Sequence, residues 1–594
     1  MILQALKEYY DRKAADPDSG IAPLGWERKD IPFLVVIDRQ GEFLCFEDTR
    51  EPAGKKPRAK SFVIPSLGEA KGNGIKSNLF WENAEYMFGL AMREKSDPTR
   101  VAEQHEAFKS KILSVKGASE SGGILTAVQA FAQNMNIEKI QADPLWPMVK
   151  EVNQSLLLAI SGCGAVTNSS EVRDAVNQIH VAQQEGDKTL CIVSGEPDIM
   201  AKLESPIRGV QGASTMGAHL VAVNNKIIES GNGGQTPAFA SFMKEKGENS
   251  PIGKTASLAY TTALNTLLGK DSKQKLQVGD ATTVFWSEKN DALEGTFADF
   301  WSEPPKDDPD RLTTAVAALF MSVGTGAFAT DSDDTKFYVL GLSPNAARIS
   351  VRFWHVKTVA ELAANFRQYF EDLRIVHSSR DPDDLSLWRL LVSTAALGKS
   401  ENIAPNLAGS VMRSILEGQP FPETLLQAAL LRAKAERDVT YTRAKLIKGC
   451  LNRKLRLSNP NHERSLAMSL DKENTNVGYR LGRLFATLEH CQKKAQPGGK
   501  DMKTIRDRFY SSASSSPASV FANLMRLNKH HLAKLTDGWE HFFSNLIGEI
   551  VYQDKDKPGI NVFPAHLSLD DQGQFAIGYY HQTQDFRTKK TDKE

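Results

Sequence analysis

The sequence is poor in the features that mark secreted, zinc-binding and membrane proteins. Its 594 residues include only five cysteines, an odd number at wide spacing, with no Cys-x-x-Cys pair and no histidines at zinc spacing. We therefore expect reduced thiols and a cytoplasmic protein. Charges interrupt the apolar residues at the N-terminus, so a signal peptide is not expected. The uncharged segment 312–330 contains Thr, Ser and Gly and predicts a buried helix instead of a membrane span.

Familiar catalytic motifs are also absent. The chain has no HExxH, no G-x-S-x-G and no Walker motif, because two glycine-lysine strings, from Gly68 and from Gly247, have the wrong spacing. Clusters of Asp at 307–310, 331–334 and 381–384 stand in polar turns that favour Asp as a capping residue. A metal-dependent nuclease built on these clusters is the catalytic alternative. Our expectation is a protein without enzymatic activity, cofactor or metal.

The chain has almost no net charge, but positive charge is concentrated in one segment. The net charge of +1 provides no global attraction for nucleic acid. Between Arg432 and Arg508, however, nineteen Lys or Arg face eight Asp or Glu, an excess of eleven. This excess indicates a track for a phosphate backbone, and a solvated basic helix face is the alternative. The candidate backbone contacts are Arg443, Lys445, Lys448, Arg453, Lys454, Arg480, Arg483, Lys493 and Lys494.

A glycine-rich loop stands out in the N-terminal part of the chain. Residues 71–78 read Lys-Gly-Asn-Gly-Ile-Lys-Ser-Asn, and the apolar residues that follow, including Phe80 and Trp81, are expected to anchor the loop. Glycines let a main chain approach a ligand closely, while Lys and Asn side chains recognise polar groups. An ordinary surface turn is the alternative. The candidate binding residues are Lys71, Gly72, Asn73, Gly74, Lys76 and Asn78.

The residue patterns predict an α+β N-terminal region followed by an all-α C-terminal helical bundle. A helix over residues 1–12, a hairpin over 32–46 and several short β-branched runs indicate mixed structure. A polar linker at 377–384 marks the expected boundary. The segments after it have helical periodicity, at 387–397, 407–416, 424–436, 442–456, 477–494, 504–510, 518–535 and 539–551.

Several strings, in order, resemble one protein family, the large subunit of the type I-C CRISPR Cascade surveillance complex. The resemblance spans essentially the whole chain, with one departure at Glu82, where the family is expected to prefer Asp. The strings that carry it are Gly74–Asn78 with Trp81–Tyr86, Ser194–Pro197, Tyr260–Asn265, Thr283–Trp286, Leu340–Arg348, Leu470–Asn474, Gly478–Arg483 and Gly578–Gln582.

The resemblance implies a non-catalytic DNA-binding subunit in antiviral defence. Guide RNA reads the target by base pairing in such complexes, while protein reads the short flanking PAM duplex and stabilises the R-loop with its displaced strand. The implied partners are target double-stranded DNA, a CRISPR RNA-containing complex with backbone and handle-binding subunits, and a recruited helicase-nuclease. Asn73 and Asn78 would then contact base edges, Lys71 and Lys76 phosphates or minor-groove acceptors, and Gly72 and Gly74 would allow close approach.

The family also implies a small subunit made from an internal start, for which Met468 is the candidate. We therefore predict a PAM-recognition and assembly region at 1–378, a helical domain at 379–467, and a C-terminal bundle at 468–594 that resembles a Cascade small subunit. A purely structural helical adaptor is the remaining alternative. Insensitivity of its complex to salt and DNA would favour that alternative.

Overall fold

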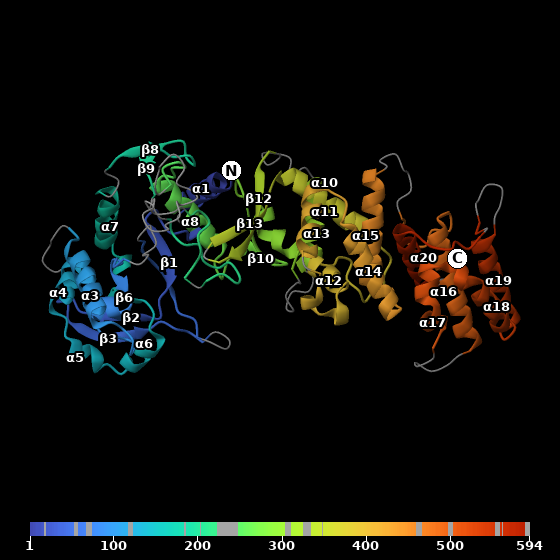
Figure 1. Cartoon of the computed structure of the whole chain (residues 1–594), viewed down its shortest axis with the longest axis horizontal. Helices are drawn as coiled ribbons and strands as arrows, with labels where there is room; N and C mark the ends of the chain where they lie inside the picture. The colour runs from blue at the N-terminus through green and yellow to red at the C-terminus, as the bar shows by residue number, and fades with distance from the viewer. Residues whose placement is uncertain are drawn as a thin grey trace, which may run out of the picture. The chain divides into compact units, whose positions relative to one another are not determined.

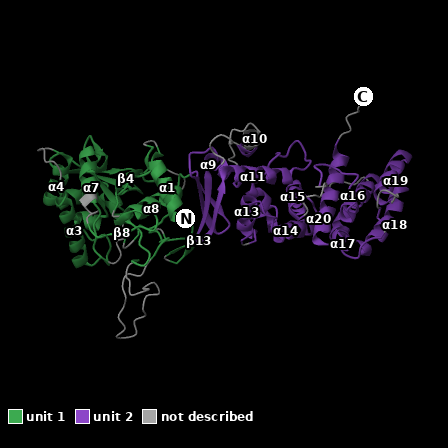
Figure 2. Ribbon diagram, turned by 90° about the horizontal axis from the view of Figure 1, so that it is seen from above, with its two compact units in different colours: residues 1–272, 343–350 green, residues 273–342, 351–594 purple. Residues whose placement is uncertain are grey.

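The computed structural model contains two compact units (Figure 2). The first comprises residues 1–272 and 343–350, and the second comprises residues 273–342 and 351–594. The boundaries of these units differ from those of the three predicted domains. The domain division stays a prediction. The structure describes residues 1–16, 19–52, 57–66, 74–116, 123–182, 186–201, 204–214, 216–222, 247–302, 311–324, 334–346, 348–404, 406–458, 466–496, 503–552, 559–560 and 562–588.

A sheet of mixed direction forms part of the first unit (Figure 1). Strand β2 (Phe33–Ile37) pairs antiparallel with β3 (Phe43–Asp48) and parallel with β6 (Leu156–Ile160). Strands β5 (Trp81–Glu82) and β7 (Gly164–Ala165) pair antiparallel with β6. The predicted hairpin is confirmed: the Asp38 carboxylate accepts hydrogen bonds from the backbone N–H groups of Gln40 and Glu42 across the turn.

The rest of the first unit consists of helices and two further pairs of strands. β6 is an unbroken apolar run that is buried along its whole length, as expected for a strand covered on both faces. Two further pairs of strands are β1 (Trp26–Asp30) with β4 (Ser61–Pro65), and β8 (Lys188–Leu190) with β9 (Pro197–Ile199). The helices are α1 (Ile2–Ala14), α2 (Ala84–Phe88), α3 (Pro98–Leu113), α4 (Ile124–Asn134), α5 (Ile137–Gln141), α6 (Trp146–Val152), α7 (Ser170–Ala182) and α8 (Lys254–Leu267).

The second unit begins with a sheet and continues as helices. Strands β10 (Lys275–Val278), β11 (Ala281–Ser287), β12 (Lys336–Asn345) and β13 (Arg348–Thr358) pair in that order. Rings of Phe285, Phe297 and Phe337 from this region join Phe366 of α11 in one core. The first helices are α9 (Leu293–Thr296), α10 (Arg311–Gly324) and α11 (Val359–Leu373). Leu312 and Val316 of α10 are buried, whereas Ala317 and Ala318 are exposed, so the predicted helix is present and is buried on one face.

The remainder of the second unit is helical, which confirms the predicted fold class. Its helices are α12 (Leu387–Val392), α13 (Leu407–Glu417), α14 (Glu423–Glu436), α15 (Tyr441–Ser458), α16 (Val477–Ala495), α17 (Ile505–Ser515), α18 (Phe521–Leu532), α19 (Asp537–Val551) and α20 (Leu569–Arg587). The prediction omitted α20. No helix in the described part of the chain combines the length and apolar character needed to cross a bilayer.

Glycines bring α16 and α20 into backbone contact. A Cβ added at Gly482 of α16 would lie 2.1 Å from the carbonyl oxygen of Phe575 in α20. A Cβ added at Gly578 of α20 would lie 2.1 Å from the carbonyl oxygen of Tyr479 in α16. Real Cβ atoms do not approach that closely, so this helix pair requires glycine at both positions.

Candidate nucleic-acid interface

The structure describes only the second half of the glycine-rich loop. Lys71, Gly72 and Asn73 lie outside the described residues, so their predicted roles stay predictions. Gly74 is exposed and Lys76 is partly buried, whereas Ser77 and Asn78 are 4% and 3% exposed. The described part of the loop therefore passes from the surface into the core within a few residues.

The buried carboxylate of Glu82 fixes the inner end of the loop. Its Oε1 accepts hydrogen bonds from the backbone N and from Nδ2 of Asn78, both at 2.9 Å. Its Oε2 accepts from the backbone N of Asn83 at 3.1 Å. The Asn78 side chain thus holds the loop in place, whereas sequence reasoning expected it to contact bases. A shorter Asp at position 82 would place its carboxylate differently, so these contacts depend on the length of the Glu side chain.

Two further hydrogen bonds hold this segment against the core. Phe80 has no exposed surface and a left-handed backbone, with φ of 69°, and its carbonyl oxygen accepts from the backbone N of Leu158 at 3.1 Å. Such a conformation is costly for a bulky residue and is tolerated because the surrounding core holds it. Trp81 is also buried and donates from Nε1 to the carbonyl oxygen of Pro65. Both residues therefore anchor the loop, as expected.

Two lysines absent from the prediction contact the loop and its anchor. Nζ of Lys111 in α3 donates to the carbonyl oxygen of Ser77 at 2.8 Å, and Nζ of Lys29 in β1 lies 4.9 Å from the centre of the Trp81 ring. Sequence spacing gave no signal for Lys29 and Lys111, because they come from elements distant along the chain.

Most of the predicted backbone contacts lie inside the second unit. Sequence reasoning expected exposed charged groups, and that expectation is wrong for six of the nine residues, which are between 1% and 5% exposed. They belong to α15 and α16. In both helices the charged side chains are buried by neighbouring elements as well as the apolar ones. The six residues are Arg443, Lys445, Lys448, Arg453, Arg480 and Arg483.

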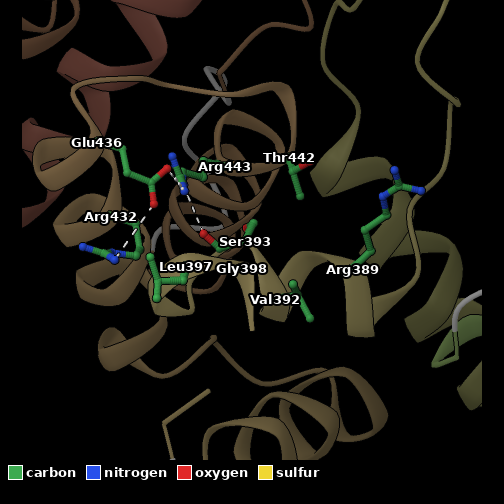
Figure 3. A pocket seen from close by; sticks show the side chains of 9 residues that line it. All are labelled: Arg389, Val392, Ser393, Leu397, Gly398, Arg432, Glu436, Thr442 and Arg443. Carbon is green, nitrogen blue, oxygen red and sulfur yellow. Dashed lines mark hydrogen bonds and ion pairs between the residues drawn. The ribbon is translucent and has the colours of Figure 1, made fainter. Parts of the chain in front are cut away.

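Arg443 lines a pocket of about 540 Å³ but uses its guanidinium internally (Figure 3). Its Nε donates to the carbonyl oxygen of Ser393 at 3.0 Å, and its Nη2 lies 2.5 Å from Oε2 of Glu436. Arg432 approaches the same carboxylate at 3.9 Å. The two guanidiniums therefore share one carboxylate, and Arg443 connects α15 to the end of α14 and to the segment after α12.

Other buried cations of α15 bind backbone carbonyls and one carboxylate. Arg453 donates to the carbonyl oxygens of Gln419 and Ser414, and its Nη1 lies 3.7 Å from Oδ2 of Asp372. Burial lowers the pKa of Arg453 to about 10 and the pKa values of Lys445 and Lys448 to about 8. Charged groups in such positions are costly unless partners satisfy them, and the partners found here belong to the fold.

The buried arginines of α16 have the same structural role. Arg483 donates from Nε to Oε1 of Gln582 at 3.2 Å and pairs through Nη2 with Oε1 of Glu549 at 2.7 Å. Arg480 donates from Nε to the carbonyl oxygen of Asn474. A contact between either guanidinium and a phosphate would require these internal bonds to break.

Three of the nine predicted contacts keep their charged ends near solvent. Nζ of Lys454 lies 2.9 Å from Oδ2 of Asp570 and 3.1 Å from Oε1 of Glu423. Nζ of Lys493 lies 2.6 Å from Oε1 of Glu489. Lys494 lies over the ring of Trp539, 4.4 Å from its centre. The structure therefore reduces the candidates for a phosphate contact to Lys454, Lys493 and Lys494.

The Asp clusters offer no assembled metal site in the parts that the structure covers. Residues 307–310 and 331–333 lie outside the described residues. In the third cluster, Asp383 pairs with His377 at 3.0 Å, and burial raises the pKa of Asp384. A search of the described ranges found no group of three or more His, Cys, Asp or Glu side chains able to hold a metal ion.

A comparison with protein families finds one match over nearly the whole chain. The family model described as CRISPR-associated protein (Cas_Csd1) matches residues 6–587. No curated protein matches this sequence. The match includes both units and confirms the resemblance to the type I-C Cascade large subunit.

Proposed function

The chain belongs to the Csd1 family of CRISPR-associated proteins, and from this premise we propose that it recognises the PAM duplex within a type I-C Cascade complex. In this role it has no catalytic activity. It stabilises the R-loop with the displaced strand and helps to recruit a helicase-nuclease. Its partners are the CRISPR RNA-containing complex, with backbone and handle-binding subunits, and a small subunit made from an internal start at Met468.

The anchored loop is the observation that best supports PAM recognition. Base readout is favoured when the side chains are already held in position at a groove edge. Ordering a mobile loop on binding would otherwise cost conformational entropy. Glu82, Phe80 and Lys111 hold the inner end of the loop, at Ser77 and Asn78, against the core. In the proposal, Asn73 contacts a base edge, Lys71 and Lys76 contact the backbone, and Gly72 and Gly74 allow close approach.

A direct test compares guide-loaded complexes with and without this chain. Each complex is titrated with target duplexes that carry every possible PAM, at two salt concentrations. We expect the complete complex to prefer particular PAMs and the complex without the chain to lose that preference. Equal PAM preference in both complexes would contradict the proposal. The same duplexes, incubated with Mg²⁺ and the purified chain, test the nuclease alternative, and we expect intact DNA.

A further inference from the structure

The pocket of about 540 Å³ in the second unit carries an excess of positive charge (Figure 3). Residues of α12, α14 and the start of α15 line it, among them Arg389, Arg432 and Arg443. Glu436 is the one carboxylate among the nine described residues of the lining. Three guanidiniums against one carboxylate leave the lining with a net charge of +2. The pocket therefore attracts an anionic group.

The fold uses the donors of these guanidiniums unequally. Arg443 donates from all three of its side-chain nitrogens to groups of the fold. Arg432 approaches Glu436 at 3.9 Å, which is beyond hydrogen-bonding distance, and its guanidinium forms no hydrogen bond within the described part of the chain. A guanidinium offers five N–H donors in a planar fork that matches a carboxylate. Arg432 can therefore bind a further carboxylate, with the exposed Arg389 at the opposite side of the pocket.

An exposed leucine borders the same pocket. Leu397 is 83% exposed and has a left-handed backbone, with φ of 59°, and Gly398 follows it with φ of 63°. This conformation is uncommon for a bulky residue and costs free energy. Because so much of the Leu397 side chain is exposed, packing within the chain offsets little of that cost. A partner that covers Leu397 would account for both its exposure and its backbone.

We propose that this pocket binds an acidic segment of a protein subunit in the CRISPR RNA-containing complex. Carboxylates of that segment pair with Arg432 and Arg389, while an apolar side chain beside them packs on Leu397 and Val392. The inference rests on the proposed function, which supplies such a complex, and it specifies the chemistry of the partner. The segment contains Asp or Glu next to an apolar residue.

A protein segment fits this lining better than a nucleic-acid strand does. Unpaired bases bind proteins by stacking on aromatic rings, and the nine described residues of the lining include no aromatic side chain. A phosphate would pair with the arginines but would leave Leu397 and Val392 without an apolar contact. An acidic segment with an apolar residue satisfies both parts of the lining, and arginine is enriched at protein interfaces.

The test measures binding of the full-length chain to the purified CRISPR RNA-containing complex that lacks it. Arg389→Glu with Arg432→Glu should weaken this binding at least about tenfold, because like charges then oppose each other. Leu397→Gly should also weaken binding without lowering the unfolding temperature, since glycine adopts the left-handed backbone without strain. Arg380→Glu and Leu457→Ser, at exposed positions outside the pocket, are the matched controls and should keep the wild-type affinity.

Photocrosslinking identifies the occupant of the pocket. p-Benzoylphenylalanine incorporated at position 397 should crosslink to a peptide of a protein subunit in which Asp or Glu stands beside an apolar residue. Changing that acidic residue to Arg should restore binding to the Arg389→Glu, Arg432→Glu variant. Crosslinks to the CRISPR RNA or to target DNA would overturn the inference. So would wild-type affinity in the double variant, and thermal unfolding verifies that each variant is folded.

Measuring PAM preference on the same assemblies separates this inference from the proposed function. A wild-type complex that assembles but shows no PAM preference would contradict the proposed function. A double variant that assembles with wild-type affinity and keeps a PAM preference would contradict the acidic partner alone.

Discussion

Oε1 of Glu82 accepts two hydrogen bonds from Asn78, one from its backbone N and one from its Nδ2, each at 2.9 Å. Both residues are buried, so water cannot replace these bonds if one partner is lost. The pair fixes the point where the glycine-rich loop enters the core. In the proposed function, Asn78 therefore acts by positioning the loop.

Glu82→Gln should destabilise the first unit and loosen the loop. A glutamine that keeps its oxygen towards Asn78 turns an NH2 group towards the backbone N–H of Asn83, so two donors face each other. We expect a loss of about 1–3 kcal/mol in the free energy of unfolding, measured by urea denaturation. Glu94→Gln, at an exposed position, is the control and should have almost no effect. Equal stability of the two variants would contradict the positioning role of Glu82.

Gly482→Ala should weaken the contact between α16 and α20. The new Cβ would lie 2.1 Å from a backbone oxygen, so the helices must separate, at a cost of about 1–3 kcal/mol or more. Gly548→Ala in α19 provides the matched control, because its Cβ meets no atom within 4 Å. There alanine should stabilise the helix by up to about 1 kcal/mol. Thermal unfolding of both variants measures the two opposite shifts.

Truncation of a buried basic residue should cost more unfolding free energy than truncation of an exposed one. Arg483→Ala leaves the buried Oε1 of Gln582 without its donor, while Glu549 keeps its pair with Lys472, and should cost about 1–3 kcal/mol of unfolding free energy. The exposed pairs of Lys454 are screened by water, so Lys454→Ala should cost at most about 1 kcal/mol. Urea denaturation measures both values. A small loss for Arg483→Ala would show that its buried position is not required.

Lys448 should give the protein a distinctive pH dependence. Burial lowers its pKa to about 8, whereas an unfolded lysine titrates near pH 10. Between these values the unfolded chain binds more protons at this position than the folded chain does, so its contribution to stability rises with pH. The unfolding free energy of the wild type, relative to Lys448→Met, should therefore increase from pH 8 to pH 10. Lys454→Met is the control, and the same rise there would contradict the assignment to Lys448.

The sequence predicted the order of helices and strands better than the tertiary contacts between them. The hairpin of β2 and β3 and the helices from α12 to α19 follow from local periodicity and turn residues, which depend on near neighbours. α20 was missed, and its role with α16 depends on Gly482 and Gly578 meeting across the fold. Such a contact leaves no local pattern.

The candidate site was harder to predict than the fold for a similar reason. Counting charges identified Arg453 and Arg483 as part of a basic segment, but their burial depends on which helices surround α15 and α16. Lys111 comes from α3 and has no sequence link to the loop that it holds. Tertiary packing decides whether a charged residue binds a ligand or stabilises the fold, and spacing along one helix does not determine it.

The most direct test of the account measures PAM choice in the reconstituted complex with Asn73→Ala and with Lys454→Ala. If Asn73 contacts a base edge, Asn73→Ala should relax selection at one PAM position by about 1–3 kcal/mol and leave the other positions unchanged. Lys454→Ala should weaken binding to all PAMs alike and reduce the salt dependence. An equal loss across all PAMs for Asn73→Ala would contradict base reading by this residue, and no loss at all would exclude the loop as the PAM reader.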